Sequence, residues 1–195
     1  MTTPNSAMTV RDAIYARRSV RHYTGERLPA ATVRELIAAA VRAPTAIHEE
    51  PWQFLVVQDE AALRRLSERA KSLLAADVRR LHLDRGARGL DVFAQPGFNV
   101  FYDAGTLIVI CGRPVGPFVV ADCWLAAENL MLAAHALGLG SCVIGSAVAA
   151  LNAPDVKQDF GIPAGSTAFA PVIVGTPQGE WPATARKPPE IIGWR

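Results

Sequence analysis

The sequence predicts an α/β or α+β domain in which helices cover a small central sheet. Amphipathic stripes at helical spacing alternate with short continuous apolar runs, and half of the 195 residues are hydrophobic while only 19% are charged. A chain of this size buries about two-thirds of its unfolded surface, enough for a core without disulfides or structural metal. No repeat or low-complexity linker divides it, so we expect a single domain over residues 1–195.

The first half begins with two helices and a strand. Thr9-x-x-Asp12 is a capping box that starts the first helix, and Pro29 opens the second, whose apolar residues recur at three- and four-residue spacing. Residues 52–57 form a strand, after which Asp59 caps a third helix. Residues 71–99 are basic, and we expect them to be partly helical with an exposed loop.

The second half contains one long, nearly all-apolar helix, 121–137, which Gly138 ends. A domain this small has limited room to bury a helix on all sides, so we expect a second copy of the chain to cover part of it. Apolar runs between Pro and Gly give the other elements: strands at 106–111, 142–144 and 168–174, and a helix at 154–160 that Gly161 closes.

The C-terminal tail, 175–195, is Pro-rich and extended. Its apolar side chains, Trp181, Ile191, Ile192 and Trp194, present more apolar surface than a free tail carries. We therefore expect the tail to pack on another part of the assembly, such as a second subunit.

Charge and cysteine usage narrow the function class. Twenty basic and 18 acidic residues give a net charge of +2, which argues against a protein that binds nucleic acid or an anionic membrane as its main task. Residues 129–151 carry no charge, but glycines and His135 interrupt them, so we interpret them as core rather than as a membrane span. Three cysteines without CxxC spacing predict reduced, buried thiols, and together with the absence of a secretory leader they predict a cytoplasmic location.

The first candidate site is the cluster Arg17-Arg18-Ser19-x-Arg21. Guanidinium forks, a hydroxyl and backbone N–H groups are what a phosphate monoester requires. Arginines at a helix C-terminus also oppose the negative end of the helix dipole, which is an equally simple explanation for the cluster. The spacing alone does not decide between the two.

The second candidate site is the turn from Ala43 to Trp52, in which Pro44 and Pro51 restrict the backbone. Thr45, His48 and Glu50 would then point in fixed directions at the mouth of the sheet. A stiff surface connection is the alternative. A metal site built on His48 is weakly supported, because the other histidines show no partner spacing.

The third candidate is the glycine-rich segment 138–145. It follows a helix and precedes a strand, which is the reverse of the order in a dinucleotide-binding loop. Its glycines instead let the backbone approach a flat group closely and present N–H groups along an edge strand, whereas Gly138 is expected to cap the preceding helix.

Taken together, these segments resemble the nitroreductase-like flavoproteins. The resemblance spans nearly the whole chain and rests on residues 13–23, 39–45 with 51–54, 98–104, 122–145 and 186–190. It implies an α+β sandwich with a central, mostly antiparallel sheet flanked by helices, in an intertwined homodimer. It also implies two FMN sites at the subunit interface and ping-pong, two-electron reduction of a small-molecule acceptor with NAD(P)H.

The resemblance also assigns site residues. Arg17, Arg18, Ser19 and Arg21 would hold the phosphate, with Arg186 reaching it from the tail. The partner subunit would contribute Pro44, Thr45 and the His48 position, and the isoalloxazine edge would lie against Val143, Ile144 and Gly145. The cofactor carries the chemistry, which accounts for the lack of a recognisable catalytic dyad.

Two positions depart from the family pattern: His48 stands where Asn is usual, and Glu50 where Gln is usual. His48 is therefore a candidate acid that delivers a proton to substrate, or a structural residue of the turn. The same scaffold supports dehalogenation and enone reduction, and a flavin- or ligand-binding dimer with little reductase activity is a further alternative.

Overall fold

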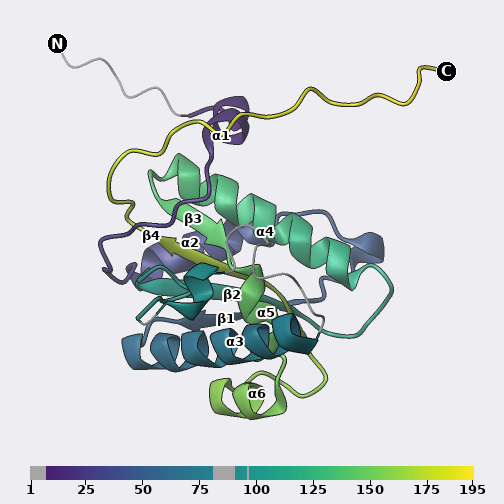
Figure 1. Ribbon diagram of the computed structural model, residues 1–195. Helices are drawn as coiled ribbons and strands as arrows, with labels where there is room; N and C mark the ends of the chain where they lie inside the picture. The colour runs from purple at the N-terminus through teal and green to yellow at the C-terminus, as the bar shows by residue number, and fades with distance from the viewer. Residues whose placement is uncertain (1–7, 81–90, 96) are drawn as a thin grey trace.

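The computed structural model describes residues 8–80, 91–95 and 97–195 and has a four-stranded sheet between helices (Figure 1). The strand order is β1-β2-β4-β3, and every neighbouring pair is antiparallel. The fold is therefore α+β, as the resemblance implies. The strands are β1 (Trp52–Val57), β2 (Thr106–Gly112), β3 (Gly140–Val143) and β4 (Thr167–Gly175). The helices are α1 (Val10–Ala16), α2 (Ala30–Ala40), α3 (Glu60–Arg80), α4 (Val119–Ala136), α5 (Val148–Leu151) and α6 (Pro154–Phe160), with 3-10 turns at Ala46–His48, Asp91–Ala94 and Gly145–Ala147.

Helices cover both faces of the sheet because its central strands are apolar on both faces. Every residue of β2 is buried, and alternate side chains enter two different cores. Leu107 and Val109 join the core beneath α3 and α5, whereas Ile108 and Ile110 join the core beneath α2 and α4. The second of these cores fixes α4 over the sheet, and α4 positions much of the candidate site.

Most predicted boundaries agree with the structure. The capping box of α1 is present, since Asp12 N–H donates to Thr9 Oγ1 at 3.1 Å and Thr9 N–H donates to Asp12 Oδ2 at 3.2 Å. Gly138 and Gly161 end their helices in the left-handed region, at φ +74° and +69°.

Two boundaries differ. The strand predicted at 142–144 runs from Gly140 to Val143, because its pairing with β4 begins at Gly140 opposite Gly175. The segment predicted at 71–99 as partly helical continues α3 as far as Arg80. The exposed loop expected in that segment falls largely on 81–90, outside the described residues.

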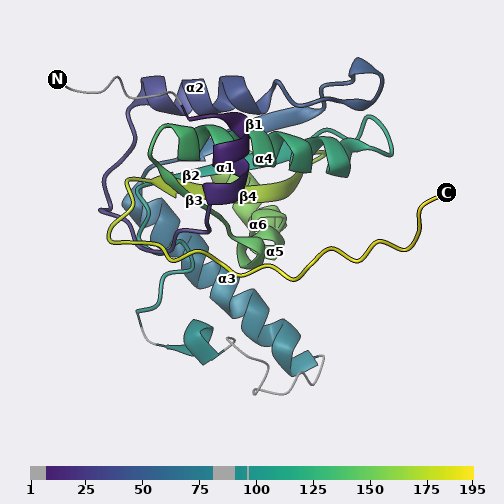
Figure 2. The same cartoon turned by 90° about the horizontal axis from the view of Figure 1, so that it is seen from above.

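The tail first folds back on the chain that follows α1 and then leaves the body. Thr24 N–H donates to Thr176 O at 3.1 Å, and the Trp181 ring lies 5.4 Å from that of His22. Beyond this point the tail runs away from the sheet (Figures 1 and 2), and Trp194 is 89% exposed. Within a single protomer Trp181 packs against the core, whereas Ile191, Ile192 and Trp194 stay exposed, so packing of the tail on a second subunit remains a prediction.

All three cysteines are buried, as predicted. Burial raises the pKa of Cys111 to about 11 and that of Cys123 to about 12, so both remain thiols at neutral pH. In the part of the chain that the structure describes, no helix has the length and apolarity needed to cross a bilayer.

Candidate functional site

The basic cluster lies beside the glycine-rich segment. Ser19 forms a parallel bridge with Ser141, and Val20 N–H donates to Ser141 O at 3.0 Å. Gly140 permits this approach, because a Cβ at that position would lie 2.7 Å from Val20 Cγ1. Two of the three candidate segments, far apart in sequence, therefore meet along β3.

A cavity of about 310 Å³, here called the donor cavity, lies where the cluster meets the C-terminal end of α4. Four buried side-chain atoms of its lining residues have no hydrogen-bond partner among the described residues: Arg17 Nε, His135 Nε2, Ser141 Oγ and Trp181 Nε1. Arg17 Nε lies 3.5 Å from Glu128 Oε1, an ion-pair distance without a hydrogen bond. The cavity thus holds unused hydrogen-bonding capacity, mainly of donors.

Arg18 also lines the donor cavity, but part of its guanidinium serves α1. Its Nη1 donates to Tyr15 O at 2.7 Å and to Arg17 O at 2.8 Å, which satisfies carbonyls at the end of that helix. The helix-end interpretation of the cluster therefore holds for Arg18, and it coexists with a role in the cavity. Burial, followed by the charges of Arg17 and Arg18, lowers the pKa of His135.

A second cavity, of about 190 Å³, follows along β3 and is here called the β3-edge cavity. Val143, Ile144 and Gly145 line it together with Arg21, whose guanidinium lies 5.9 Å from the centre of the Tyr102 ring. The structure thus separates Arg21 from Arg17 and Arg18. Because β3 spans only about 10 Å, the two cavities are successive stretches of one strand edge.

The remaining candidate segment, the turn from Ala43 to Trp52, lies at the other end of α4. Ala46 N–H donates to Asp122 Oδ1 at 3.3 Å, and the Glu49 carboxylate lies against Gly116. Asp122 is in the first turn of α4 and His135 in the last, about 20 Å apart at 1.5 Å per residue. Pro44, Thr45 and His48 are therefore remote from the donor cavity within one chain, and in Figure 1 their turn lies at the opposite end of α4 from β3.

Residues 44–50, here called the 44–50 turn, hold an unusual backbone. Ile47, His48 and Glu50 have φ values of +46°, +58° and +42°, a region that costs non-glycine residues about 1–3 kcal/mol each. Arg113 Nη2 donates to Glu50 O at 3.0 Å and helps to fix the turn. The turn leaves the His48 and Ile47 side chains exposed, and fixed directions for its side chains stay a prediction.

Two further regions contribute less. Arg186 lies in the exposed tail, and among the described residues it has no hydrogen bond or ion pair with the cluster, so its role stays a prediction.

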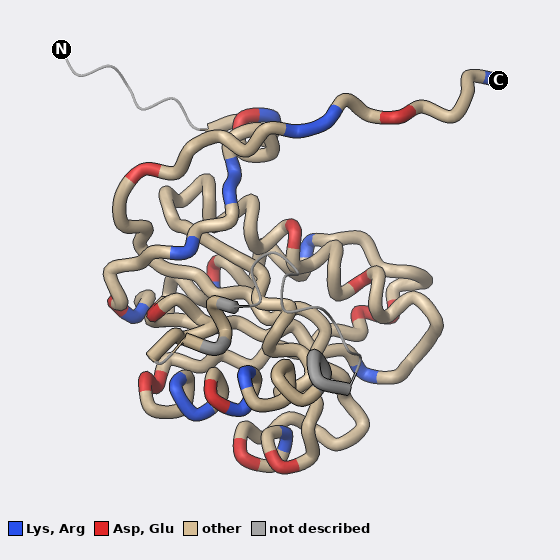
Figure 3. The backbone as a smooth tube through the Cα atoms, in the orientation of Figure 1, with Lys and Arg blue, Asp and Glu red and all other residues tan. Residues whose placement is uncertain are grey.

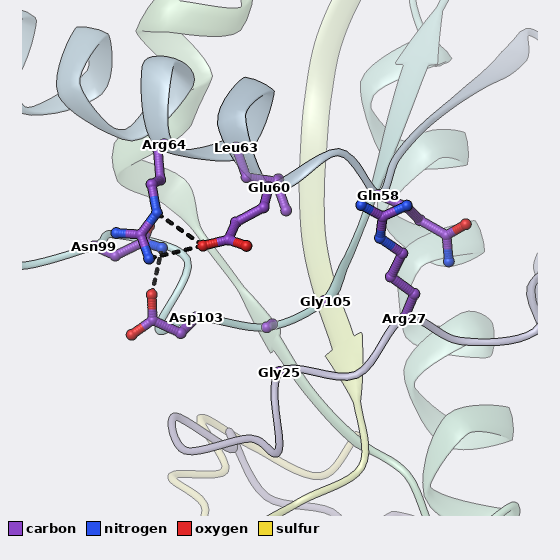
Figure 4. A pocket seen from close by; sticks show the side chains of 10 residues that line it. Gly25, Arg27, Gln58, Glu60, Leu63, Arg64, Asn99, Asp103 and Gly105 are labelled. Atoms are coloured by element: carbon purple, nitrogen blue, oxygen red, sulfur yellow. Dashed lines mark hydrogen bonds and ion pairs between the residues drawn. The ribbon is translucent and has the colours of Figure 1, made fainter.

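A third cavity, of about 210 Å³, contains none of the predicted site residues (Figure 4). Arg64 pairs with Glu60 at 2.9 Å, and Asn99 donates to Asp103 at 2.9 Å, which is typical of a solvated surface network.

His135, Ser141 and Trp181 are not among the site residues predicted from the sequence. A signal existed for two of them: His135 is a polar residue in the last turn of an otherwise apolar helix, and Ser141 lies between a glycine and a buried cysteine. Figure 3 shows basic residues spread over many elements, so charge alone would not have singled out this region.

A strand edge with a donor-rich cavity at one end and an aromatic-lined cavity at the other is typical of an α+β protein that holds an elongated ligand with an anionic end. The chain belongs to the nitroreductase family, whose model matches residues 14–176. A protein of Archaeoglobus fulgidus, named as a candidate NADH dehydrogenase/NAD(P)H nitroreductase, is 30% identical over 172 residues, which cover 86% of this chain and 84% of that protein.

Solved structures with a similar fold support the assignment to this family. A nitroreductase with bound FMN from Bacteroides fragilis has a TM-score of 0.80 and 27% identity, with 95% of this chain and 98% of that chain covered. An iodotyrosine deiodinase bound to FMN and 3-iodo-L-tyrosine has a TM-score of 0.74 and 25% identity, with 94% and 97% covered. The family prediction is confirmed and supports an oxidoreductase, while its members include proteins named for different reactions.

Proposed function

We propose that the protein is an FMN-dependent oxidoreductase, active as a homodimer, that transfers a hydride from NAD(P)H to a flat, electron-poor acceptor such as a nitroaromatic or a quinone. The observation that carries this proposal is the succession of the donor cavity and the β3-edge cavity along one strand, in a chain whose relatives include FMN-bound proteins.

The residues that line the two cavities have the chemistry needed to bind FMN. The cofactor has a phosphate at one end and a ring at the other, and the unpartnered donors of the donor cavity match phosphate oxygens. The β3-edge cavity has apolar and aromatic walls suited to a ring. Gly145 begins a 3-10 turn, so the N–H groups of its first residues have no partner within that turn and can donate to a ring edge.

When bound, FMN would accept and donate the hydride, and the protein would orient it and set its electrostatics. Arg21 is the guanidinium in the β3-edge cavity, and it would offset negative charge placed on the ring by reduction. Its stacking on Tyr102 holds it at that position. Arg17, Arg18 and Ser19 would fix the phosphate, and Arg186 would reach it from the tail.

A second copy would complete the site. The α4 surface exposes Val120, Trp124 and Leu125, an apolar stripe that a second α4 can cover. Packing two α4 helices antiparallel across a two-fold axis would place the 44–50 turn of one protomer at the cavities of the other. Pro44, Thr45 and His48 would then contact a cofactor held by the partner.

His48 is proposed to deliver a proton to the acceptor from this turn. Its exposed side chain suits that role, whereas a purely structural role would leave turnover unchanged. Replacing His48 with Asn should change the dependence of turnover on pH. Turnover with an unchanged pH profile would assign His48 to the structure of the turn.

The direct test of the function is the absorption spectrum of the isolated protein, recorded again under nitrogen after addition of NADH or NADPH. Bound flavin that bleaches, and recovers on addition of a quinone or a nitroaromatic, is the expected result. Bound flavin that neither nicotinamide bleaches would favour a flavin-binding protein without reductase activity, and 3-iodotyrosine as acceptor tests the dehalogenation that a relative's name suggests. A colourless protein that takes up no FMN would overturn the proposal.

A further inference from the structure

The donor cavity concentrates unsatisfied polar atoms. Seven buried side-chain nitrogen or oxygen atoms in the described residues lack a hydrogen-bond partner, and four of the seven belong to residues that line this one cavity. Buried polar groups in proteins are almost always hydrogen-bonded, because an unpaired one costs free energy. Such a concentration indicates that these atoms bind a ligand together.

The chemistry of the four atoms defines the ligand. Arg17 Nε and Trp181 Nε1 can only donate, and the Ser141 hydroxyl, 2% exposed, can donate as well. Arg18 adds a second guanidinium, and no carboxylate lines the cavity among the described residues. The matching ligand is a compact anion with several acceptor oxygens, which describes a phosphate monoester.

We propose that His135, Ser141 and Trp181 complete the phosphate site begun by Arg17 and Arg18, and that His135 takes up a proton when the phosphate binds. The inference rests on the proposed function, because it identifies the anion as the phosphate end of FMN. The donor cavity is at the opposite end of β3 from the cavity assigned to the ring, as an elongated ligand requires.

The proposed uptake of a proton follows from the charges around His135. Arg17 and Arg18 line the cavity with His135 from the segment after α1, and Glu128 of α4 pairs with Arg17. The tail contributes Pro177 and Trp181, which do not titrate, and β3 contributes Ser141 and the glycine before it. Burial and the two guanidinium groups keep the pKa of His135 low, so its ring is neutral near pH 7. A phosphate dianion raises that pKa again, and binding then takes up a proton.

The direction of the pH dependence follows: the affinity for FMN rises as the pH falls. The second ionisation of a phosphate monoester lies near pH 6, so from about pH 7 upward the ligand remains largely a dianion and a change in affinity reports the protein. We expect the affinity for FMN to fall about threefold or more from pH 7 to 8.5, whereas riboflavin, which lacks the phosphate, should show no such change.

The test measures dissociation constants of FMN and riboflavin by quenching of flavin fluorescence, for apoprotein of the wild type and of three variants. Ser141→Ala and Trp181→Phe each remove one donor, the second while keeping an aromatic side chain, and His135→Gln keeps an amide donor but cannot titrate. We expect the first two to weaken FMN about tenfold and to leave riboflavin unchanged. His135→Gln should abolish the dependence of FMN affinity on pH, and Trp194→Phe, in the exposed tail, is the matched control for the tryptophan.

The outcomes separate the two proposals. Variants that weaken FMN and riboflavin by the same factor, or not at all, would show that these residues serve the fold only and would overturn the phosphate site. Retained pH dependence in His135→Gln would overturn the protonation. If the wild type binds neither flavin, the proposed function fails, and titration with inorganic phosphate then tests the site directly: binding that the three variants weaken supports it, and no binding rejects it.

Discussion

The two ends of α4 carry opposite chemistry. At the C-terminal end, Arg17, Arg18 and His135 surround a cavity of unpartnered donors, whereas at the N-terminal end the unpartnered buried atoms are carboxylate oxygens, Asp122 Oδ2 and Glu49 Oε2. Both arrangements agree with the helix dipole, which favours acidic groups at its N-terminus and basic groups at its C-terminus. One chain keeps these ends about 20 Å apart, so neither can satisfy the other within a protomer.

The backbone differs between the two ends as well. At the donor end, close packing is achieved by glycine, since Gly140 lets Val20 approach β3. At the acceptor end, Ile47, His48 and Glu50 are non-glycine residues in the left-handed region. Backbone strain of this kind persists only when its surroundings hold it, and it is common at sites that contact ligands. The contrast fits the proposed homodimer, in which the donor end of one protomer would meet the acceptor end of a second copy.

The largest effect should come from breaking the apolar stripe of Val120, Trp124 and Leu125 in the N-terminal half of α4. Leu125 is 45% exposed on α4, so Leu125→Glu should leave the protomer folded while placing two like charges in the proposed interface. We expect a monomer by sedimentation and loss of bound flavin from the purified protein, because each site would lack the 44–50 turn of its partner.

The control for this prediction is Val56→Glu, at an exposed position of β1, which is an edge strand of the sheet and is not part of the α4 stripe. It should remain dimeric and retain flavin. A Leu125→Glu protein that stays dimeric would place the interface elsewhere, and a monomer that still binds flavin would show that one chain holds a complete site.

A smaller effect is expected at the donor end itself. In Gly140→Ala, the new Cβ would meet Val20 at 2.7 Å, forcing the 17–21 segment away from β3 at a cost of about 1–3 kcal/mol of unfolding free energy. Urea denaturation measures this cost. Gly165→Ala, where a Cβ meets nothing within 4 Å, is the matched control and should change stability by less than about 0.5 kcal/mol. Equal free energies of unfolding for the two variants would mean that Val20 can move away from position 140 without loss of stability.

Local patterns predicted the fold because each element has a signal within a few residues. The capping box at Thr9, the Pro29 start of α2 and the glycine ends of α4 and α6 are local, and the structure contains them all. The start of β3 was misplaced because register depends on β4, which lies nearly 30 residues further along the chain.

The site was predicted only in part, because tertiary contacts rather than local patterns bring several of its residues together. Arg17 and Ser141 are brought together by one backbone bridge that no spacing encodes, and Trp181 reaches the cavity only because the tail pairs with residues 22–24. The separation of Arg21 from Arg17 could not be predicted either, since four residues in sequence say nothing about which cavity each side chain lines. Residue type identified the chemistry, and tertiary contacts decided which residues share it.

The smallest effect should come from the acceptor end. Asp122 is 3% exposed, and its Oδ1 accepts the Ala46 N–H at 3.3 Å. Asp122→Asn keeps that acceptor but replaces a charge-assisted hydrogen bond with a neutral one, which should cost about 1 kcal/mol. Hydrogen exchange at the Ala46 amide should then quicken by about fivefold, since 1.4 kcal/mol corresponds to a factor of ten. Asp155→Asn, at an exposed position in the first turn of α6, is the control and should leave this amide unchanged.

If FMN affinity also falls severalfold in Asp122→Asn, the turn acts on a cofactor held by the partner's donor end. If exchange at Ala46 quickens while FMN affinity stays constant, the two ends of α4 are independent and the complementarity between them has no role in binding.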